Sequence, residues 1–261
     1  MNNKIWFITG ASRGFGRIWA EAALTRDDKV AATSRKLADV ADLSERFGDA
    51  VLPLALDVVD ADQVREAVQK AHTHFGRLDV VLNNAGYTLD GTVEEANEAD
   101  VRALFDTNYF GQLRVIQAAL PLLRQQGSEH ILGVSSSLGI AAMPLTGFYC
   151  ATKWAVEALH ESLAQEVKSF GIKVPLLEPD AYATDFWKPR VAEDHTGNGR
   201  LFRSSEAGFR AAIERSAVYS GLLPLSTVLC CHPAKRGARP QANAGFEAVA
   251  PVQRLAFLKW S

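Results

Sequence analysis

Two residues four positions apart, Tyr149 and Lys153, form the most informative pair in the chain for acid–base chemistry. If the segment FYCATKWAVEAL is helical, the two side chains lie on one face about one turn apart, with the ammonium beside the phenol. A free tyrosine has a pKa near ~10 and is a poor acid–base catalyst at neutral pH. A neighbouring positive charge favours the phenolate, so we expect the pKa of Tyr149 to be lowered toward the working range. The alternative is a packed tyrosine beside a solvated lysine.

A glycine-rich turn near the N-terminus predicts a phosphate-binding site. The apolar run KIWFIT leads into TGASRGFG (residues 9–16), and a helical pattern follows. Glycines let the backbone approach a pyrophosphate closely, and a helix N-terminus supplies free N–H groups and a favourable dipole. The spacing is Gly-x-x-x-Gly-x-Gly rather than the commoner Gly-x-Gly-x-x-Gly, and a glycine turn without a ligand is the alternative.

Alternating strand and helix patterns must position these residues. Helical patterns separate short apolar runs, and this alternation indicates right-handed βαβ units with helices on both faces of a parallel sheet. The sequence therefore predicts an α/β protein: one doubly wound Rossmann-type domain over residues 1–261. The expected strands are KIWFIT, KVAAT, AVLPLAL, LDVVLN, EHILGVS and IKVPLLE, and the expected helices lie near 15–26, 36–47, 60–75, 97–126 and 147–170. Beyond them we expect a helix at 205–218 and a last strand in VQRLAFL.

Composition and charge exclude several classes of protein. The chain has 261 residues, 48% of them hydrophobic, which is enough for one sizeable core. Its net charge of −2 comes without a basic stripe, so nucleic acid is not an expected partner. The first apolar run is too short for a signal peptide, and the run 218–231 is too short to span a bilayer. We expect a cytoplasmic protein without a membrane partner.

The cysteines and histidines predict neither a disulfide nor a metal site. The three cysteines lack the spacing of a disulfide framework or a metal site and suit a reducing compartment. His72 and His74 are expected to point to different sides of a helix. His160 is expected at a helix surface or interface.

Several further motifs lie in the same order along the chain, and together they carry a family resemblance. The chain resembles a short-chain dehydrogenase/reductase of the commoner type, over about residues 4–190. The matching landmarks are residues 9–16, Asp57-Val58, Asn83-Asn84-Ala85-Gly86, Asn108, Ser136, and Tyr149 with Lys153.

The resemblance implies four catalytic residues. Tyr149 would protonate a carbonyl oxygen during reduction or act as the base in the reverse direction, while Lys153 lowers its pKa and holds the nicotinamide ribose. Ser136 would hydrogen-bond the substrate oxygen, with neighbouring Ser135 as the competing assignment. Asn108 would anchor a water that links Lys153 to solvent. The alternatives are a helix-interior amide capping a bulge for Asn108 and a strand-end turn for Ser136.

The resemblance also implies a cofactor site. Asp57 would meet the adenine amino group, although a helix cap for the stretch near Asp60 is an alternative. Asn84 would touch the ribose, Asn83 would tie adjacent strands together, and Thr184 would bind the nicotinamide carboxamide. The predicted cofactor-binding residues are Gly10, Ser12, Arg13, Gly14, Phe15, Gly16, Ser34, Arg35, Asp57, Val58, Asn84, Ala85, Gly86, Tyr149, Lys153, Pro179, Tyr182 and Thr184.

The end of the second strand indicates which nicotinamide cofactor is used. An Asp or Glu there would accept from the ribose 2′-OH, but this chain has Ser34 followed by Arg35. Arg13 lies inside the glycine turn, and two guanidiniums suit a 2′-phosphate. The sequence predicts NADP(H) over NAD(H), with two solvated surface arginines as the alternative.

The expected substrate site is apolar, which favours a hydrophobic ketone, aldehyde or secondary alcohol. The candidate lining residues are Met143, Leu145, Phe148, Tyr182, Phe186 and Trp187. Two features depart from the family pattern. Asp180 replaces the usual glycine after Pro179, and an atypical C-terminal segment (226–261) follows the expected substrate loop and lid (180–225).

The helices at 108–126 and 149–170 carry more apolar residues than one sheet-facing side needs, which predicts a homodimer or homotetramer unless the C-terminal segment covers them. The leading interpretation is an NADP(H)-dependent carbonyl reductase or alcohol dehydrogenase acting on a small molecule. One alternative is a catalytically weak dinucleotide-sensing regulatory or scaffold protein. Another is an epimerase or dehydratase.

Overall fold

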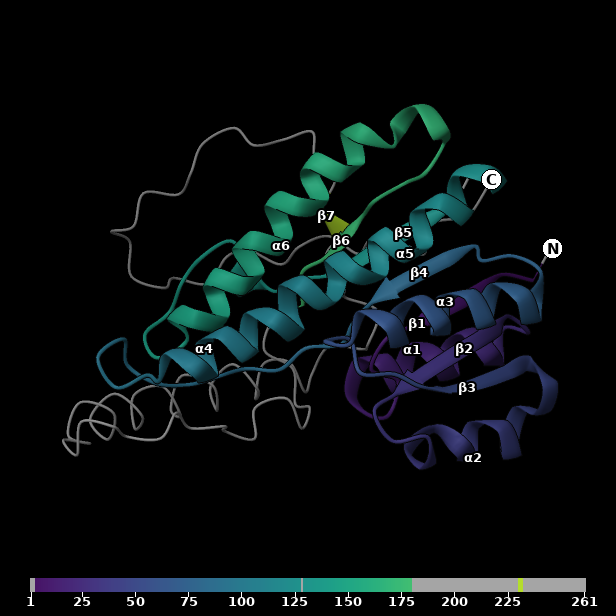
Figure 1. Cartoon of the computed structure of the whole chain (residues 1–261), viewed down its shortest axis with the longest axis horizontal. Coiled ribbons are helices and arrows are strands. Elements are labelled where there is room, and N and C mark those ends of the chain that lie inside the picture. Colours follow the sequence, from purple (N-terminus) through teal and green to yellow (C-terminus); the bar gives the residue numbers. More distant parts are fainter. Residues whose placement is uncertain (1–2, 128, 180–229, 232–261) are drawn as a thin grey trace, which may run out of the picture.

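The computed structural model describes residues 3–127, 129–179 and 230–231 (Figure 1). Its centre is a seven-stranded sheet in the order β3-β2-β1-β4-β5-β6-β7. The first six strands are parallel, and only β7 runs antiparallel to its neighbour. The strands are β1 (Ile5–Ile8), β2 (Lys29–Ser34), β3 (Val51–Ala55), β4 (Val80–Asn83), β5 (His130–Val134), β6 (Leu176–Leu177) and β7 (Cys230–Cys231).

All six predicted strands form, so the predicted fold class is confirmed. The sixth is much shorter than IKVPLLE suggests. Before Leu176–Leu177, Lys173 makes only an isolated bridge with His130. The seventh strand, Cys230–Cys231, lies in an apolar run where no strand was expected.

In the described part of the chain, six α-helices connect and cover the strands. They are α1 (Gly14–Thr25), α2 (Ala38–Phe47), α3 (Ala61–Phe75), α4 (Glu98–Phe105), α5 (Gly111–Gln126) and α6 (Gly147–Glu166). Single turns of 3₁₀-helix occupy Gly48–Ala50, Ser137–Gly139 and Lys168–Phe170. The helix expected over 97–126 is interrupted, because Asp106–Phe110 adopts a π-helical turn between α4 and α5.

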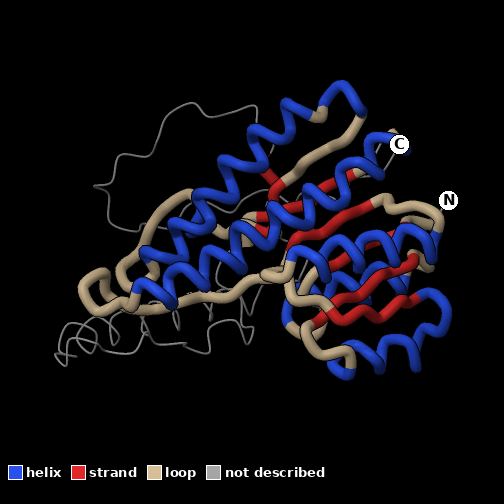
Figure 2. The backbone as a smooth tube through the Cα atoms, viewed as in Figure 1, coloured by secondary structure: helices blue, strands red, loops and turns tan. Residues whose placement is uncertain are grey.

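Helices bury both faces of the sheet, as Figures 1 and 2 show. On one face Val64 of α3, Val115 of α5 and Leu163 of α6 pack in a cluster with Phe7. On the other face Ala20 of α1 and Leu43 of α2 belong to a cluster with the neighbouring strand residues. The strands are apolar nearly throughout because neither face meets water.

The strand order reverses beside β1, which pairs with β2 on one side and with β4 on the other. In open α/β sheets, ligands bind beyond the carboxyl ends of the strands at such a switch point. The loops that leave β1, β4 and β5 there begin with the glycine turn, with Asn84 and with Ser135. The fold therefore gathers the predicted motifs at one edge, which we call the carboxyl edge.

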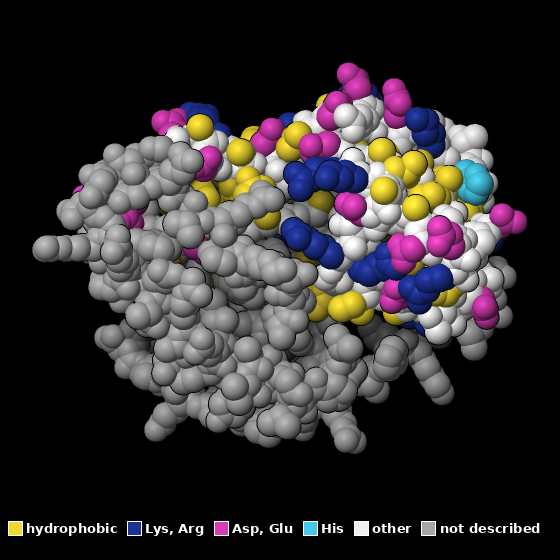
Figure 3. Space-filling model, turned by 90° about the horizontal axis from the view of Figure 1, so that it is seen from below, with side chains coloured by type: hydrophobic (Ala, Val, Ile, Leu, Met, Phe, Trp, Pro, Cys, Tyr) yellow, Lys and Arg dark blue, Asp and Glu magenta, His cyan; other side chains and the backbone are white. Residues whose placement is uncertain are grey.

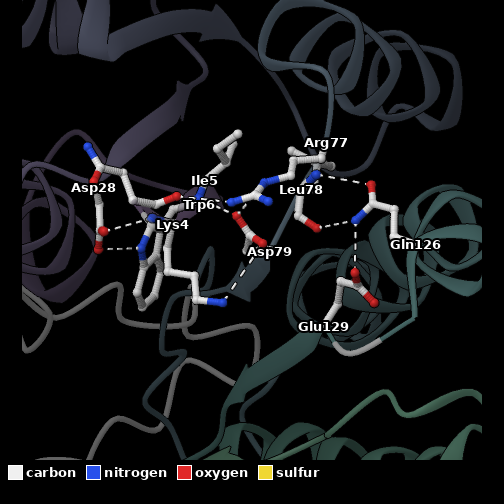
Figure 4. Close-up of polar contacts among 10 residues, drawn as sticks. Lys4, Ile5, Trp6, Asp28, Arg77, Leu78, Asp79, Gln126 and Glu129 are labelled. Carbon is white, nitrogen blue, oxygen red and sulfur yellow. Dashed lines mark hydrogen bonds and ion pairs between the residues drawn. The ribbon is translucent and has the colours of Figure 1, made fainter. Parts of the chain in front are cut away.

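The opposite edge, where the parallel strands begin, is held by side-chain contacts to the backbone; we call it the amino edge (Figure 4). Asp28 accepts hydrogen bonds from the Lys4 backbone N–H at 2.9 Å and from the Trp6 indole at 3.0 Å. Asp79 accepts from the Ile5 backbone N–H at 2.8 Å. These bonds hold the first residues of β1 in place between β2 and β4.

The described surface carries both charge signs. On the face seen from below, Lys and Arg side chains alternate with Asp and Glu rather than forming one basic field (Figure 3). Within the described residues, no helix is both long and apolar enough to cross a lipid bilayer.

Several expectations fall outside the described residues. They are the helix at 205–218, the strand in VQRLAFL, Asp180, Tyr182, Thr184, Phe186 and Trp187, together with nearly all of the segments 180–225 and 226–261. The expectation for His160 is wrong. Its side chain is 0% exposed and packs against β5, where a Cβ added at Gly133 would lie 2.3 Å from its Nε2 atom.

Candidate active site

Tyr149 and Lys153 lie on α6 at the carboxyl edge, and each is only 3% exposed. The Lys153 Nζ atom donates a hydrogen bond of 2.7 Å to the Val134 carbonyl oxygen at the end of β5. It lies 5.5 Å from the centroid of the Tyr149 ring. The helical spacing thus places the ammonium beside the phenol, and the lysine is not a solvated surface charge.

The pKa of Tyr149 differs from the sequence-based expectation. Burial raises the pKa of Tyr149 above its ordinary value, because the phenolate would lose its hydration. A hydrogen bond with Ser136 acts in the opposite direction, while the charges of Cys150 and Asp90 raise the pKa further. The expected lowering is therefore wrong for this structure: desolvation outweighs the favourable contacts.

The charge of Lys153 is also shaped by burial. Desolvation lowers the pKa of Lys153 to about 8, and the nearby carboxylate of Glu157 partly opposes this change. Glu157 lies four residues further along the same face of α6 and is itself buried. The lysine therefore titrates much closer to neutral pH than an exposed lysine does.

Ser136, rather than Ser135, shares the space of Tyr149. The Ser136 hydroxyl accepts from the Leu138 backbone N–H at 3.2 Å and contacts the Pro179 carbonyl oxygen at 3.4 Å. Its hydrogen bond with Tyr149 contributes to the pKa of the phenol. The Ser135 hydroxyl instead lies against Gly139, where an added Cβ would be 2.5 Å away. The Leu138 contact also gives Ser136 the strand-end turn role considered as its alternative.

Asn108 lies in the π-helical turn, fully buried, with its side-chain amide engaged. Its Oδ1 atom accepts from the Tyr87 backbone N–H at 3.0 Å, and its Nδ2 atom donates to the Tyr87 carbonyl oxygen at 2.9 Å. A further bond of 3.2 Å reaches the Thr152 hydroxyl on α6. The amide thus ties the loop after β4 to the helix of Tyr149 and does not cap the bulge.

The glycine turn is open beside Gly14 and closely packed at Gly16. Gly10 and Gly14 have φ angles of +69° and +58°, which side chains with a Cβ rarely adopt. At Gly16 a Cβ would lie 2.3 Å from the Gly10 carbonyl oxygen and 2.4 Å from the Asn84 Nδ2 atom. Arg13 occupies the N-cap position without a side-chain cap, and the first turn contains no acidic residue. These features suit an anion at the helix N-terminus.

The two neighbouring asparagines differ in their side-chain contacts, and the contact of Asn84 with a ribose stays a prediction. The Asn84 Nδ2 atom donates to the carbonyl oxygens of Thr9 at 2.8 Å and Gly10 at 3.0 Å, so Asn84 ties β4 to the glycine turn. The Thr9 hydroxyl in turn accepts from the backbone N–H groups of Asn84 and Ala85. The buried amide of Asn83 makes no hydrogen bond among the described residues. The strand-tying role assigned to Asn83 belongs to Asn84, because Asn84 is the first residue beyond the strand and faces the turn.

The residues predicted to select the cofactor lie near this turn. Arg13 and Arg35 are exposed, and neither forms an ion pair within the described part of the chain. Arg17, by contrast, pairs with Glu21 and Asp42. Ser34 is buried at the end of β2.

Asp57 follows β3 and does not cap α3. Its Oδ1 atom accepts from the Val59 backbone N–H at 3.2 Å. The cap of α3 is Asp60, whose side chain accepts from the N–H groups of Asp62 and Gln63. The helix-cap alternative for Asp57 is therefore wrong.

Val58 is buried beside the start of α5, where a Cβ added at Gly111 would lie 2.7 Å from a Val58 methyl carbon. Gly86 lies close to Asn108, because a Cβ there would approach the Asn108 Oδ1 atom to 3.1 Å. The first contact joins the segment after β3 to α5, and the second joins the loop after β4 to the π-helical turn that carries Asn108.

Apolar side chains surround the Tyr149 ring. Tyr149 packs in a buried cluster with Leu89, Leu104 and Leu138, and Met143 and Phe148 pack partly buried against it. Leu145 is buried with a positive φ of 66°. Three of the six predicted lining residues therefore lie in the segment that leads to Tyr149.

Two polar residues near Tyr149 were not predicted. Thr152 donates to the Tyr149 carbonyl oxygen at 2.7 Å and accepts from Asn108. Its place in the sequence, directly before Lys153, is the signal that could have pointed to it. Asp90 is 5% exposed and acts on Tyr149 through its charge. The described residues contain no cluster of three or more His, Cys, Asp or Glu side chains suited to a metal ion.

A family model described as short chain dehydrogenase matches residues 4–195. The chain belongs to this family. It is an oxidoreductase of the short-chain dehydrogenase/reductase family. It is similar to "Oxidoreductase BOA17" of Botryotinia fuckeliana, with 49% identity covering 77% of this chain and 76% of that protein. It is 37% identical to the "3-ketodihydrosphingosine reductase" of Bacteroides thetaiotaomicron, covering 99% of this chain and 92% of that protein.

Solved structures of other family members share the fold. A short-chain dehydrogenase from Streptomyces avermitilis is 38% identical with a TM-score of 0.71, covering 76% of this chain and 74% of that one. ElxO with bound NADP is 30% identical with a TM-score of 0.68, covering 70% and 76%. A 3-ketoacyl-(acyl-carrier-protein) reductase from Brucella melitensis complexed with NADH is 29% identical with a TM-score of 0.68, covering 70% and 78%.

Proposed function

We propose that this short-chain dehydrogenase/reductase is an NADP(H)-dependent carbonyl reductase or alcohol dehydrogenase for a hydrophobic ketone or aldehyde. The observation that carries the proposal is the buried Tyr149 phenol, hydrogen-bonded to Ser136 and flanked by the Lys153 ammonium. It lies at the same sheet edge as the open glycine turn. The Tyr149 phenol can donate a proton, and the glycine turn can bind the pyrophosphate of a dinucleotide. Their position at one edge suits a reaction that couples hydride transfer to protonation.

The residues of the chain would divide the work as follows. Tyr149 gives its proton to the carbonyl oxygen during reduction and takes it back during oxidation, while Ser136 donates a hydrogen bond to the same oxygen. The raised pKa keeps the phenol protonated at neutral pH, which suits its use as a general acid. Lys153 holds the ribose and supplies positive charge beside the phenol, with Asn108 fixing the loop that faces it. A bound nicotinamide dinucleotide would supply or accept the hydride.

The glycine turn fits a dinucleotide on physical grounds. The left-handed backbone at Gly10 and Gly14, the open space beside Gly14 and the uncapped start of α1 leave N–H groups for a pyrophosphate. Exposed Arg13 and Arg35 have no carboxylate partner in the described segments, so both are available to a 2′-phosphate. One solved relative has NADP bound and another has NADH bound, so membership of the family does not decide between the two cofactors. The proposed preference for NADP(H) therefore rests on Arg13 and Arg35.

The cofactor preference has a direct test. Arg35→Asp should reverse the preference, because the new carboxylate repels a 2′-phosphate and accepts from a 2′-hydroxyl. The ratio of kcat/KM for NADPH to that for NADH is the measurement. Arg77→Asp, a charge reversal at the amino edge, serves as the control and should leave the ratio unchanged. Equal use of both cofactors by the unaltered enzyme would contradict the assignment.

The apolar cluster around Tyr149 and the name of the Bacteroides relative both support a ketone substrate. The central experiment is a panel of ketones and aldehydes, with 3-ketodihydrosphingosine included, in which oxidation of NADPH is followed. Tyr149→Phe should lower kcat by about 10²–10⁴-fold, since it removes only the transferable proton. Binding of NADPH without oxidation by any carbonyl would favour the dinucleotide-sensing alternative, and conversion without net oxidation would favour an epimerase or dehydratase.

We further propose that the enzyme is a cytoplasmic homodimer or homotetramer paired through α5 and α6. Phe110 and Trp154 are exposed near these helices, and a surface hollow lined by Val101, Phe105 and Phe110 adjoins them. Light scattering that finds a monomer at micromolar concentration would reject the pairing. Trp154→Glu should weaken a dimer formed through this surface.

A further inference from the structure

Asp90 is a buried carboxylate in the loop that packs against the segment leading to Tyr149. The side chain is 5% exposed, and its charge contributes to the raised pKa of Tyr149. Its hydrogen bond within the described residues is to the Thr88 hydroxyl, from Oγ1 to Oδ1 at 2.9 Å, and none of the ion pairs found there includes Asp90. Burial raises the pKa of Asp90 as well, since the carboxylate has lost most of its water.

Backbone contacts hold Asp90 against the catalytic segment. The next residue, Gly91, donates its N–H to the Leu145 carbonyl oxygen at 2.9 Å, only four residues before Tyr149. The preceding residue, Leu89, packs in the same buried cluster as Tyr149 and Leu138. Both neighbours of Asp90 are therefore held against residues that surround the Tyr149 side chain.

Glu95, a second buried carboxylate in the same loop, shows that burial alone does not give a carboxylate an effect on the pKa of Tyr149. Glu95 is equally buried, and its Oε2 atom accepts from the Thr92 hydroxyl. The Glu95 backbone N–H also donates to the same hydroxyl at 3.2 Å, as in a local turn. Glu95 is not among the groups that act on Tyr149, whereas Asp90 is. The two residues share chemistry and differ in their relation to the reacting atoms.

We propose that Asp90 is a specificity-determining residue that selects carbonyl substrates carrying an ammonium group on the carbon next to the carbonyl. This inference rests on the proposed function, because it assigns a substrate class to the same site. A buried carboxylate costs free energy unless cations or donors meet both of its oxygens, and the Thr88 hydroxyl donates to one oxygen of Asp90. A substrate ammonium close to the carbonyl would meet this need when the carbonyl oxygen is placed at Tyr149 and Ser136. An anionic substituent there would be repelled.

The test uses three aliphatic ketones that are identical except at the carbon next to the carbonyl, which bears an ammonium, a hydroxyl or a methyl group. With the unaltered enzyme and NADPH, we expect kcat/KM to be highest for the ammonium ketone, by about tenfold or more over the methyl ketone. In Asp90→Asn this advantage, measured as the ratio of kcat/KM for the ammonium ketone to that for the methyl ketone, should fall to less than about threefold. Asp90→Ser, which also removes the charge, provides the same comparison should Asp90→Asn not fold.

Glu95→Gln is the matched control, since it removes a buried, threonine-bonded carboxylate from the same loop. It should retain the full preference for the ammonium ketone. Turnover of the methyl ketone at least as well as the ammonium ketone by the unaltered enzyme would overturn the inference and leave the proposed function intact. The same holds if Asp90→Asn keeps the ammonium preference. Turnover of none of the three ketones, or of any panel carbonyl, would overturn both.

Discussion

The two edges of the sheet use polar residues in opposite ways. At the amino edge, carboxylates and amides are paired with the backbone: Asp79 binds the Ile5 N–H and lies 3.2 Å from Arg77, while Gln126 bonds both the N–H and the carbonyl oxygen of Leu78 (Figure 4). Burial shifts pKa values at both edges: those of Lys153 and Asp90 at the carboxyl edge, and those of Glu129 and His130 at the amino edge.

The comparison distinguishes polar groups that hold the fold from polar groups for which we propose a role in chemistry. A hydrogen-bonded group stabilises modestly, whereas a buried group with an incomplete set of partners costs stability. The amino edge has few such groups, one Glu129 oxygen among them, whereas Asn83 and Ser135 at the carboxyl edge make no side-chain hydrogen bond within the described chain. Buried polar groups without hydrogen bonds are expected at a site that binds a ligand.

The largest expected effect is on activity at the carboxyl edge. Lys153→Met should lower kcat/KM by about 100-fold or more, because it removes the positive charge beside the Tyr149 phenol. Steady-state kinetics with NADPH and an accepted ketone measure the loss. The matched control is Lys4→Met, which removes a lysine 3.9 Å from Asp79 at the amino edge and should leave kcat/KM within about twofold. A comparable loss in both variants would break the contrast between the edges.

The second effect is on stability at the amino edge. Asp79→Ala should lower the free energy of unfolding by roughly 1–3 kcal/mol, since the buried N–H of Ile5 loses its acceptor. Urea unfolding followed by circular dichroism measures the change. Activity per folded molecule should stay the same at temperatures well below the transition. Unchanged stability would show that the amino edge does not hold β1 in place.

The third effect is a pH dependence that arises from Lys153. Its pKa is lowered to about 8 in the folded protein, while the unfolded lysine keeps the value of 10.5. Between pH 8 and about 10 the unfolded state therefore binds more protons, so stability should rise with pH, by roughly 1–2 kcal/mol. Above pH 10 the raised pKa of Tyr149 acts with the opposite sign.

Denaturant titrations at several pH values compare the unaltered protein with Lys153→Met. The variant should lack the rise between pH 8 and 10, because it has no group to deprotonate there. Identical slopes in the two proteins would mean that the ammonium is not held in a desolvated site.

The smallest effect is a gain in stability at the carboxyl edge. Asn83→Leu should raise the free energy of unfolding by about 1 kcal/mol, because a buried amide without hydrogen bonds among the described residues is replaced by an apolar group of similar size. The change is read from the urea midpoint. Asn84→Leu is the informative counterpart: it should destabilise the protein, as it breaks the bonds to Thr9 and Gly10. A loss of stability in both variants would contradict the assignment of Asn84 as the tie.

Much of this arrangement was predictable from local patterns. Apolar runs separated by helix-length intervals gave the six parallel strands, and the Tyr-x-x-x-Lys spacing placed Tyr149 and Lys153 on one face of α6. Such patterns report on contacts between residues close in sequence. The π-helical turn at Asn108 was not predicted, because the apolar periodicity continues through it.

The errors share a different cause. His160 was expected at the surface, yet it fills the space beside Gly133, a residue of another element. The pKa of Tyr149 was expected to fall, but burial by residues from three separate segments raises it. Asp90 has no motif of its own, and the contacts of its neighbours Leu89 and Gly91 with residues far away in the sequence bring it to the site.

The order of strands and helices, the family and the proposed catalytic pair could be predicted from the linear sequence, since each depends on short-range periodicity and spacing. Which asparagine ties the turn, how far burial moves each pKa and which carboxylate stands beside the phenol were decided by the tertiary structure. These properties depend on desolvation and on distances between segments far apart in the chain, and neither quantity is encoded in local spacing.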